Sequence, residues 1–134
     1  RLERELDFCK RGDYAKYWIA NAGTRHLRLA DDGSVYRGVN LSTYTSATLA
    51  FYWKLAATMQ SDDNFYVEIS SNSGSTWTSI LTINSSNASS TYGRFEYSLG
   101  SSYRVAGFRV RFRGISQNEN DDYFYADNIT ITGN

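Results

Sequence analysis

Residues 47–55 read Ala-Thr-Leu-Ala-Phe-Tyr-Trp-Lys-Leu, and large apolar side chains fill alternate positions of this stretch. Leu49, Phe51, Trp53 and Leu55 form one set, whereas Tyr52 and Lys54 fall between them. A period of two is the pattern of a half-buried antiparallel strand. We therefore predict a strand here, with the first set facing a core and Tyr52 and Lys54 pointing away from it.

Two other segments alternate in the same way. Phe65, Val67 and Ile69 alternate with Tyr66 and Glu68, and the segment 108–113 places an arginine after each apolar residue. Weaker alternation occurs at 26–29, 35–41, 76–83, 94–99 and 123–131, and turn residues separate these runs. Eight or nine short strands predict an all-β fold, a two-sheet antiparallel β-sandwich of jelly-roll type. We expect residues 1–134 to be a single domain, with residues 1–12 forming either a short helix or a lead-in strand.

The composition excludes several classes of protein. The 134 residues hold 14 Lys and Arg against 14 Asp and Glu, so we expect no nucleic-acid partner. No apolar run approaches the length that a membrane span needs, so we expect no membrane insertion. A single cysteine leaves no internal disulfide, and 11 tyrosines with abundant Ser, Thr and Asn are typical of a secreted or cell-surface module. Because the chain begins at Arg1 and not at Met, we expect a processed product or a piece of a longer chain.

Residues 70–77 read Ser-Ser-Asn-Ser-Gly-Ser-Thr-Trp, which resembles the Asp-box pattern with Asn72 in the Asp position. We expect the Asn72 side chain to cap a turn, Gly74 to adopt a positive φ and Trp77 to fold back over the hairpin. The predicted role is structural. One such box in a short chain is unlike the sialidase propellers, which contain several.

Three groups of residues resemble, in their order and spacing, a MAM-like or carbohydrate-binding-module-like β-jelly-roll. They are 39–42 with 47–53, 63–70 running into 75–77, and 108–113 with 125–129. The match covers about residues 35–133, and such accessory domains occur in reelin-type repeats and in secreted bacterial peptidases and glycoside hydrolases. The resemblance implies an extracellular module with neighbouring domains in a larger parent chain. The absence of paired cysteines favours a bacterial relative.

The same resemblance implies a structural calcium ion, with Asp127 as a ligand and Asp63 or Asp62 and Asp7 or Glu5 as its partners. Calcium prefers six to eight hard oxygen ligands, so Cys9, where the group has Glu, would be a poor ligand. The alternative is that these acidic residues only cap turns and lie in solvent.

The non-core faces of the strong strands offer a candidate ligand site. If these strands share a sheet, rings and charges lie together on one exposed face that suits an anionic or neutral polysaccharide. The residues are Tyr52, Lys54, Tyr66, Glu68, Arg109, Arg111 and Arg113. The alternative is ordinary cross-strand pairing, in which each pair contributes roughly 0.2–1 kcal/mol. A second aromatic cluster, at Tyr14, Tyr17 and Trp18, lies in a stretch whose pattern is that of a loop.

Catalysis has little support, because Cys9 and His26 are the only residues of their types and lie in different segments. We do not expect an enzyme. The sequence favours a non-catalytic carbohydrate-binding or adhesion module of a secreted or cell-surface protein. The alternative is a protein-contact or spacer domain of a secreted peptidase or adhesin.

Overall fold

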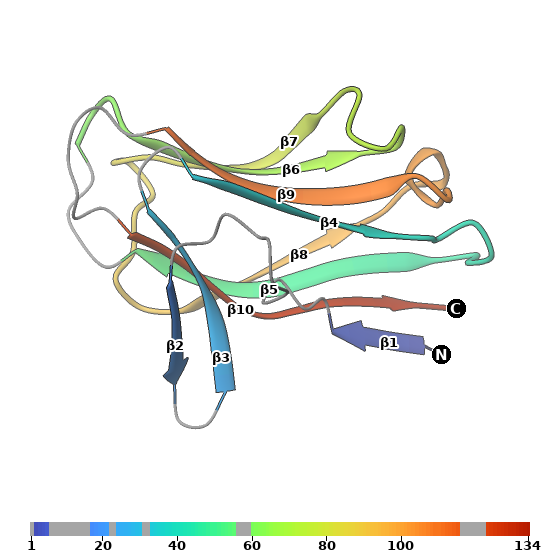
Figure 1. Ribbon diagram of the computed structural model, residues 1–134, viewed down its shortest axis with the longest axis horizontal. Coiled ribbons are helices and arrows are strands. Elements are labelled where there is room, and N and C mark those ends of the chain that lie inside the picture. The colour runs from blue at the N-terminus through green and yellow to red at the C-terminus, as the bar shows by residue number, and fades with distance from the viewer. Residues whose placement is uncertain (1, 6–16, 22–23, 31–32, 56–59, 116–122) are drawn as a thin grey trace.

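A computed structural model describes residues 2–5, 17–21, 24–30, 33–55, 60–115 and 123–134, and two antiparallel β-sheets face each other in it (Figure 1). This confirms the predicted all-β sandwich. The strands are β1 (Leu2–Glu5), β2 (Tyr17–Asn21), β3 (Thr24–Ala30), β4 (Ser34–Val39), β5 (Ala47–Leu55), β6 (Asn64–Ser70), β7 (Thr78–Ile83), β8 (Gly93–Ser98), β9 (Phe108–Ile115) and β10 (Tyr123–Gly133). Within the described ranges, helical structure is limited to one 3₁₀ turn, η1 (Ser101–Tyr103).

The larger sheet has six strands. Five follow the order β2-β3-β10-β5-β8, and β1 also pairs with β10, next to its C-terminal end. The same edge of β10 therefore pairs with β3 through residues 123–126 and with β1 through residues 130–133. Between these two pairings Asn128 adopts a φ of 49°, and the register with β5 shifts.

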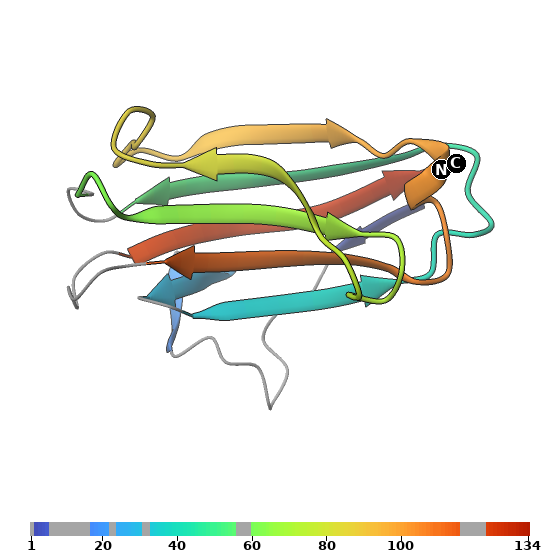
Figure 2. The ribbon, with the colours of Figure 1, turned by 90° about the horizontal axis from the view of Figure 1, so that it is seen from above.

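The smaller sheet has four strands in the order β4-β9-β6-β7 (Figure 2). One of its two inner strands, β9, alternates strictly: Phe108, Val110 and Phe112 are fully buried, whereas the arginines between them are partly exposed. The pleat sends successive side chains to opposite faces, so the arginines line the outer surface of this sheet.

Aromatic rings from both sheets meet in the core. Phe112 of β9 lies 5.3 Å from Phe51 of β5 and 5.8 Å from Phe124 of β10, measured between ring centroids. Phe65 lies 5.6 Å from Phe124. Phe51, Phe65 and Phe112 are buried as predicted, and Trp53 is half-buried at the margin of the core.

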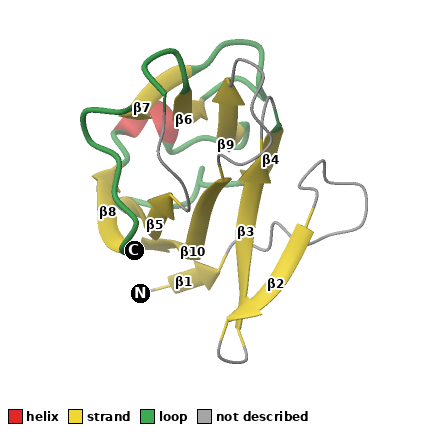
Figure 3. Ribbon diagram, turned by 90° about the vertical axis from the view of Figure 1, so that its left-hand side faces the viewer, coloured by secondary structure: helices red, strands yellow, loops and turns green. Residues whose placement is uncertain are grey.

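The sequence pattern missed β2. Residues 17–21, which include Tyr17 and Trp18 of the stretch that we expected to be a loop, form a strand that pairs with β3 and extends with it away from the four-stranded sheet (Figures 1 and 3). The run Tyr-Trp-Ile has high β-propensity but no alternation of apolar and polar residues, so the period-two pattern does not reveal it, and its pairing with β3 identifies it as a strand. Tyr14 lies outside the described residues, as do residues 6–12 of the lead-in; residues 2–5 form β1.

In the described part of the chain we find no helix long and apolar enough to cross a membrane.

Candidate functional site

The strands that carry the predicted ligand residues belong to different sheets. Tyr52 and Lys54 lie on β5 of the six-stranded sheet, whereas Tyr66 and Glu68 lie on β6 of the four-stranded sheet. Arg109 and Arg111, on β9, join the second pair. The condition for a single face, that these strands share one sheet, is therefore not met. The apolar sides of both sheets face each other across the core, so their polar sides point in opposite directions.

The structure brings together seven side chains on the outer face of the four-stranded sheet. We call this set the arginine–aromatic face: Tyr36, Tyr66, Glu68, Trp77, Arg109, Arg111 and Arg113. Cross-strand pairing produces it, because Arg111 of β9 lies between Tyr36 of β4 and Glu68 of β6, and Arg113 lies opposite Tyr66.

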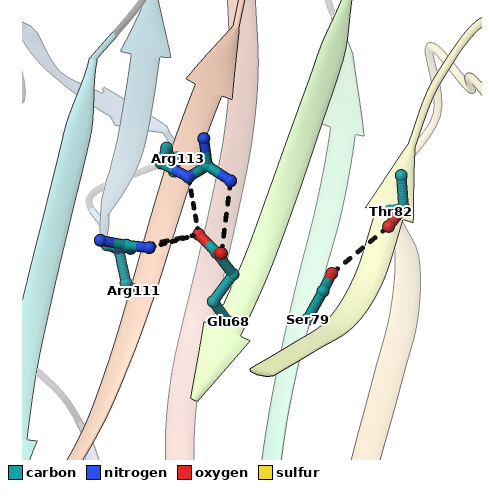
Figure 4. Close-up of polar contacts among 5 residues, drawn as sticks. All are labelled: Glu68, Ser79, Thr82, Arg111 and Arg113. Carbon is teal, nitrogen blue, oxygen red and sulfur yellow. Dashed lines mark hydrogen bonds and ion pairs between the residues drawn. The ribbon is translucent and has the colours of Figure 1, made fainter. Parts of the chain in front are cut away.

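Glu68 organises two of the arginines (Figure 4). Its residue surface is only 6% exposed. Its Oε1 accepts hydrogen bonds from Arg111 Nε at 3.1 Å and Arg113 Nε at 2.8 Å, and its Oε2 accepts one from Arg113 Nη2 at 3.3 Å. The hydrogen bond to Glu68 raises the pKa of Arg113. A nearly buried carboxylate thus fixes the positions of two guanidinium groups.

Each of the three arginines also lies over an aromatic ring. The distance from Cζ to the ring centroid is 4.8 Å for Arg109 over Tyr36, 4.1 Å for Arg111 over Trp77 and 4.7 Å for Arg113 over Tyr66. These are cation–π distances. The face is consequently a layer of alternating rings and guanidinium groups whose orientation is set before any ligand arrives.

The loop that precedes β7 brings Trp77 onto this face. The Oδ1 atom of Asn72 accepts two hydrogen bonds, one from Ser70 Oγ at 2.8 Å and one from the backbone N–H of Thr76 at 2.9 Å. The Asn72 side chain therefore caps the turn. Ser73 and Gly74 have φ values of 57° and 86°. A Cβ atom at Gly74 would lie 3.2 Å from Trp77 Cζ2, so the indole covers the glycine closely.

A second aromatic surface lies on the outer face of the six-stranded sheet, and we call it the tyrosine face. The Lys54 ammonium lies 4.7 Å from the ring centroid of Tyr92 and 5.3 Å from that of Tyr125. Burial, Asp127 and Tyr125, in that order of effect, raise the pKa of Tyr92 to about 12. The tyrosine face comprises Tyr52, Lys54, Tyr92, Tyr123, Tyr125 and Asp127.

Sequence reasoning missed several members of these faces. Alternation in residues 123–127 could have identified Tyr123 and Tyr125, because both share the side of β10 that bears Asp127. Tyr36 could have been found in the same way on β4, where it lies between buried Val35 and a half-buried arginine. Tyr92 precedes β8 and follows no strand periodicity, so only the tertiary structure reveals its position.

The predicted calcium ligands are separated where the structure describes them. Asp127 lies on the tyrosine face and accepts from the backbone N–H of Asn128 at 2.9 Å. Asp63 is 1% exposed and precedes β6 in the other sheet, where it accepts from the N–H of Gln60 at 3.3 Å. Asp7 lies outside the described residues. Among those described, no three His, Cys, Asp or Glu side chains form a group that could hold a metal ion. Calcium binding stays a prediction, which a calorimetric Ca²⁺ titration after chelator treatment tests.

No family model and no curated protein matches this sequence. Solved structures are similar in fold. The cleaved adhesin domain of the Lys-gingipain of Porphyromonas gingivalis w83 has a TM-score of 0.59 at 16% identity, over 97% of this chain and 91% of that one. A mutant family 29 carbohydrate-binding module has a TM-score of 0.57 at 14% identity, over 90% and 79%. A family 4 module has a TM-score of 0.57 at 16% identity, over 89% and 76%. The chain thus shares the β-sandwich fold of carbohydrate-binding modules and of an adhesin domain.

Proposed function

We propose that this chain is a non-catalytic glycan-binding module of a secreted or cell-surface protein, and that the glycan lies on the arginine–aromatic face. One observation carries the proposal. Three guanidinium groups and three aromatic rings alternate on a single sheet face, and nearly buried Glu68 holds two of the guanidinium groups in place. Similarity in fold to carbohydrate-binding modules supports the same function.

The chemistry of the face suits a sugar. Rings contact the apolar faces of pyranoses, and Tyr36, with 48% of its surface exposed, is the most accessible ring of the set. Guanidinium N–H groups donate to hydroxyl and ring oxygens. On neighbouring β7, the hydroxyls of Ser79 and Thr82 lie 3.3 Å apart on exposed residues (Figure 4) and can both donate and accept.

The degree of preorganisation favours this face over the tyrosine face. All three of its guanidinium groups lie over rings, and two of them, those of Arg111 and Arg113, are also held by the Glu68 carboxylate. Among the described residues, the ammonium of Lys54 contacts rings but forms no ion pair. Donors that are already fixed lose less side-chain entropy on binding, so the arginine–aromatic face is the better site for a weakly bound polar ligand.

Affinity electrophoresis through gels that contain soluble polysaccharides tests the proposal. The matched variants are Tyr66→Ala on the arginine–aromatic face and Tyr52→Ala, whose parent residue is 39% exposed on the opposite side of the molecule. We expect Tyr66→Ala to weaken retardation by about tenfold, as for an interface residue whose truncation costs more than about 1 kcal/mol, and Tyr52→Ala to leave it within about twofold. The reverse result would show that the glycan binds the tyrosine face and not the arginine–aromatic face.

The second candidate is a protein-contact or spacer function, and similarity to an adhesin domain favours it. It predicts that a broad panel of neutral and charged polysaccharides retards neither the wild-type protein nor the variants. That outcome would overturn the glycan-binding proposal.

A further inference from the structure

The arginine–aromatic face concentrates positive charge in a protein whose formal net charge is zero. Arg109, Arg111 and Arg113 contribute three positive charges, and Glu68 contributes one negative charge. Within the described residues, both ion pairs of this face go to Glu68, and Arg109 has no carboxylate partner. The face therefore carries a local excess of two positive charges.

The geometry of the hydrogen bonds shows which N–H groups remain for a ligand. Arg111 and Arg113 both direct Nε and Nη2 at Glu68. Neither Nη1 group forms a hydrogen bond within the described part of the chain. Arg109 forms none through any nitrogen there, although its guanidinium is placed by Tyr36 and lies against Gly74.

Such a guanidinium favours an oxyanion. The planar fork of arginine matches the two oxygens of a carboxylate or sulfate, and charge-assisted hydrogen bonds are about twice as strong as neutral ones. The Arg109 guanidinium lies over the Tyr36 ring and close to Gly74 in the turn of residues 70–77. These two neighbours partly exclude water from it. Partial exclusion of water strengthens the attraction of this group for a negative charge.

We propose that the bound glycan is anionic and that an oxyanion on it, a uronate carboxylate or a sulfate ester, binds the Arg109 fork with help from the free N–H groups of Arg111 and Arg113. This inference rests on the proposed function, because it specifies the ligand of the same face. Nucleic acid is a poorer candidate, since nucleic-acid binders carry a much larger basic excess.

Matched pairs of polymers test the charge preference. Polygalacturonate is compared with its methyl-esterified form, and dextran sulfate with dextran, by affinity electrophoresis and by calorimetry at low and at physiological salt. We expect about tenfold tighter binding to at least one charged member than to its neutral counterpart, as one bidentate charged contact provides. The two pairs separate the carboxylate source from the sulfate source.

Variants then assign the preference to Arg109. We expect Arg109→Gln to abolish the preference for the charged polymer and Arg109→Lys, which keeps the charge and loses the fork, to retain only part of it. Arg94→Gln is the control, because Arg94 is an exposed arginine of β8 on the other sheet and pairs with Glu96. Near-ultraviolet circular dichroism verifies that each variant is folded.

Each remaining outcome has a definite meaning. Equal affinity for charged and neutral polymers would overturn this inference and leave the glycan function in place. Arg109→Gln and Arg94→Gln could lose equal affinity for the charged polymer, or a single-stranded DNA oligonucleotide could bind equally tightly. Either result would show that the preference is unspecific electrostatic attraction and would also overturn this inference. Failure to bind any of the four polymers, or any other glycan, would overturn both proposals.

Discussion

Glu68 is the residue on which the arginine–aromatic face depends. A carboxylate that is 6% exposed would be costly to bury alone, but here it receives hydrogen bonds from two arginines whose side chains are 22% and 32% exposed. Removing one partner of such a set leaves charged groups without their counterion. The loss should therefore exceed that of an ordinary surface ion pair.

We expect Glu68→Ala to lower the free energy of unfolding by about 1–3 kcal/mol, because two partly buried guanidinium groups lose their acceptor. The control is Glu96→Ala, which breaks the exposed pair with Arg94 and should cost no more than about 1 kcal/mol. Urea denaturation measures both. Equal losses of unfolding free energy in the two variants would show that Glu68 contributes no more to stability than an exposed ion-pair residue.

Tyr92 shows how the tyrosine face responds to pH. Its hydroxyl oxygen is buried and has no hydrogen-bond partner in the described part of the chain. Its pKa is raised from 10.0 to about 12, first by burial and then by Asp127 and Tyr125. The folded state thus holds this proton more tightly than the unfolded state, and the stability that this contributes is present below pH 10 and is lost as the pH rises toward 12.

We expect Tyr92→Phe to leave the melting temperature at pH 7 unchanged or slightly higher, since the removed hydroxyl is buried without a partner in the described part of the chain. Between pH 10 and pH 12 the variant should lose less stability than the wild-type protein. Thermal melts at a series of pH values measure the difference. Parallel curves for the two proteins across this range would contradict the raised pKa.

At the scale of the element, the turn of residues 70–77 shapes the face that β9 supplies. Asn72 and Ser70 close the turn through side-chain hydrogen bonds, and the backbone N–H of Ser73 donates to Gly107 O at 2.9 Å. The turn is therefore tied to the start of β9. Through Trp77 and Gly74 it also positions Arg111 and Arg109.

We expect Gly74→Ala to cost about 1–2 kcal/mol, because a positive φ disfavours any Cβ and this one would meet Arg109 Nη1 at 3.1 Å and Trp77 Cζ2 at 3.2 Å. Gly93→Ala is the control, since its Cβ would enter open space. Urea denaturation gives the cost, and near-ultraviolet circular dichroism reports the movement of the indole. An unchanged indole signal with wild-type stability would contradict the close packing at Gly74.

At the scale of the whole molecule, the aromatic core separates the arginine–aromatic face from the tyrosine face. Phe112 contacts Phe51 and Phe124 of the opposite sheet, so the strand that presents arginines to solvent also anchors the sandwich. The strand order places Arg109, Arg111 and Arg113 on one side and Tyr52 and Lys54 on the other. A ligand that covers one face leaves the other accessible.

We expect Phe112→Ala to destabilise the protein by about 3–5 kcal/mol, as removal of a fully buried ring creates a cavity between the sheets. Tyr36→Ala removes an exposed ring from the neighbouring strand and should cost about 1 kcal/mol or less. Guanidinium denaturation compares the two. Similar costs would indicate that the sheets are not held together at Phe112.

Much of the fold was predictable because a period of two is visible wherever one side of a strand is buried. The alternation in 47–55, 65–70 and 108–113 correctly placed Phe51, Phe65 and Phe112 in the core. β2 was missed because its position depends on pairing with β3 and not on an alternating pattern. The candidate site was only half predictable, since periodicity shows which residues share a side of one strand but not which strands share a sheet.

The sequence by itself determined the fold class, the core residues and the outward position of Tyr52, Tyr66 and the β9 arginines, because local alternation encodes burial. Only the tertiary structure decided which of these side chains meet. Strand order is set by contacts between residues far apart in the chain: β9 pairs with β6 and β4, and β5 with β10 and β8. Long-range pairing of this kind places Glu68 beside Arg111 and Arg113. It also places all three residues on the opposite side of the core from Tyr52.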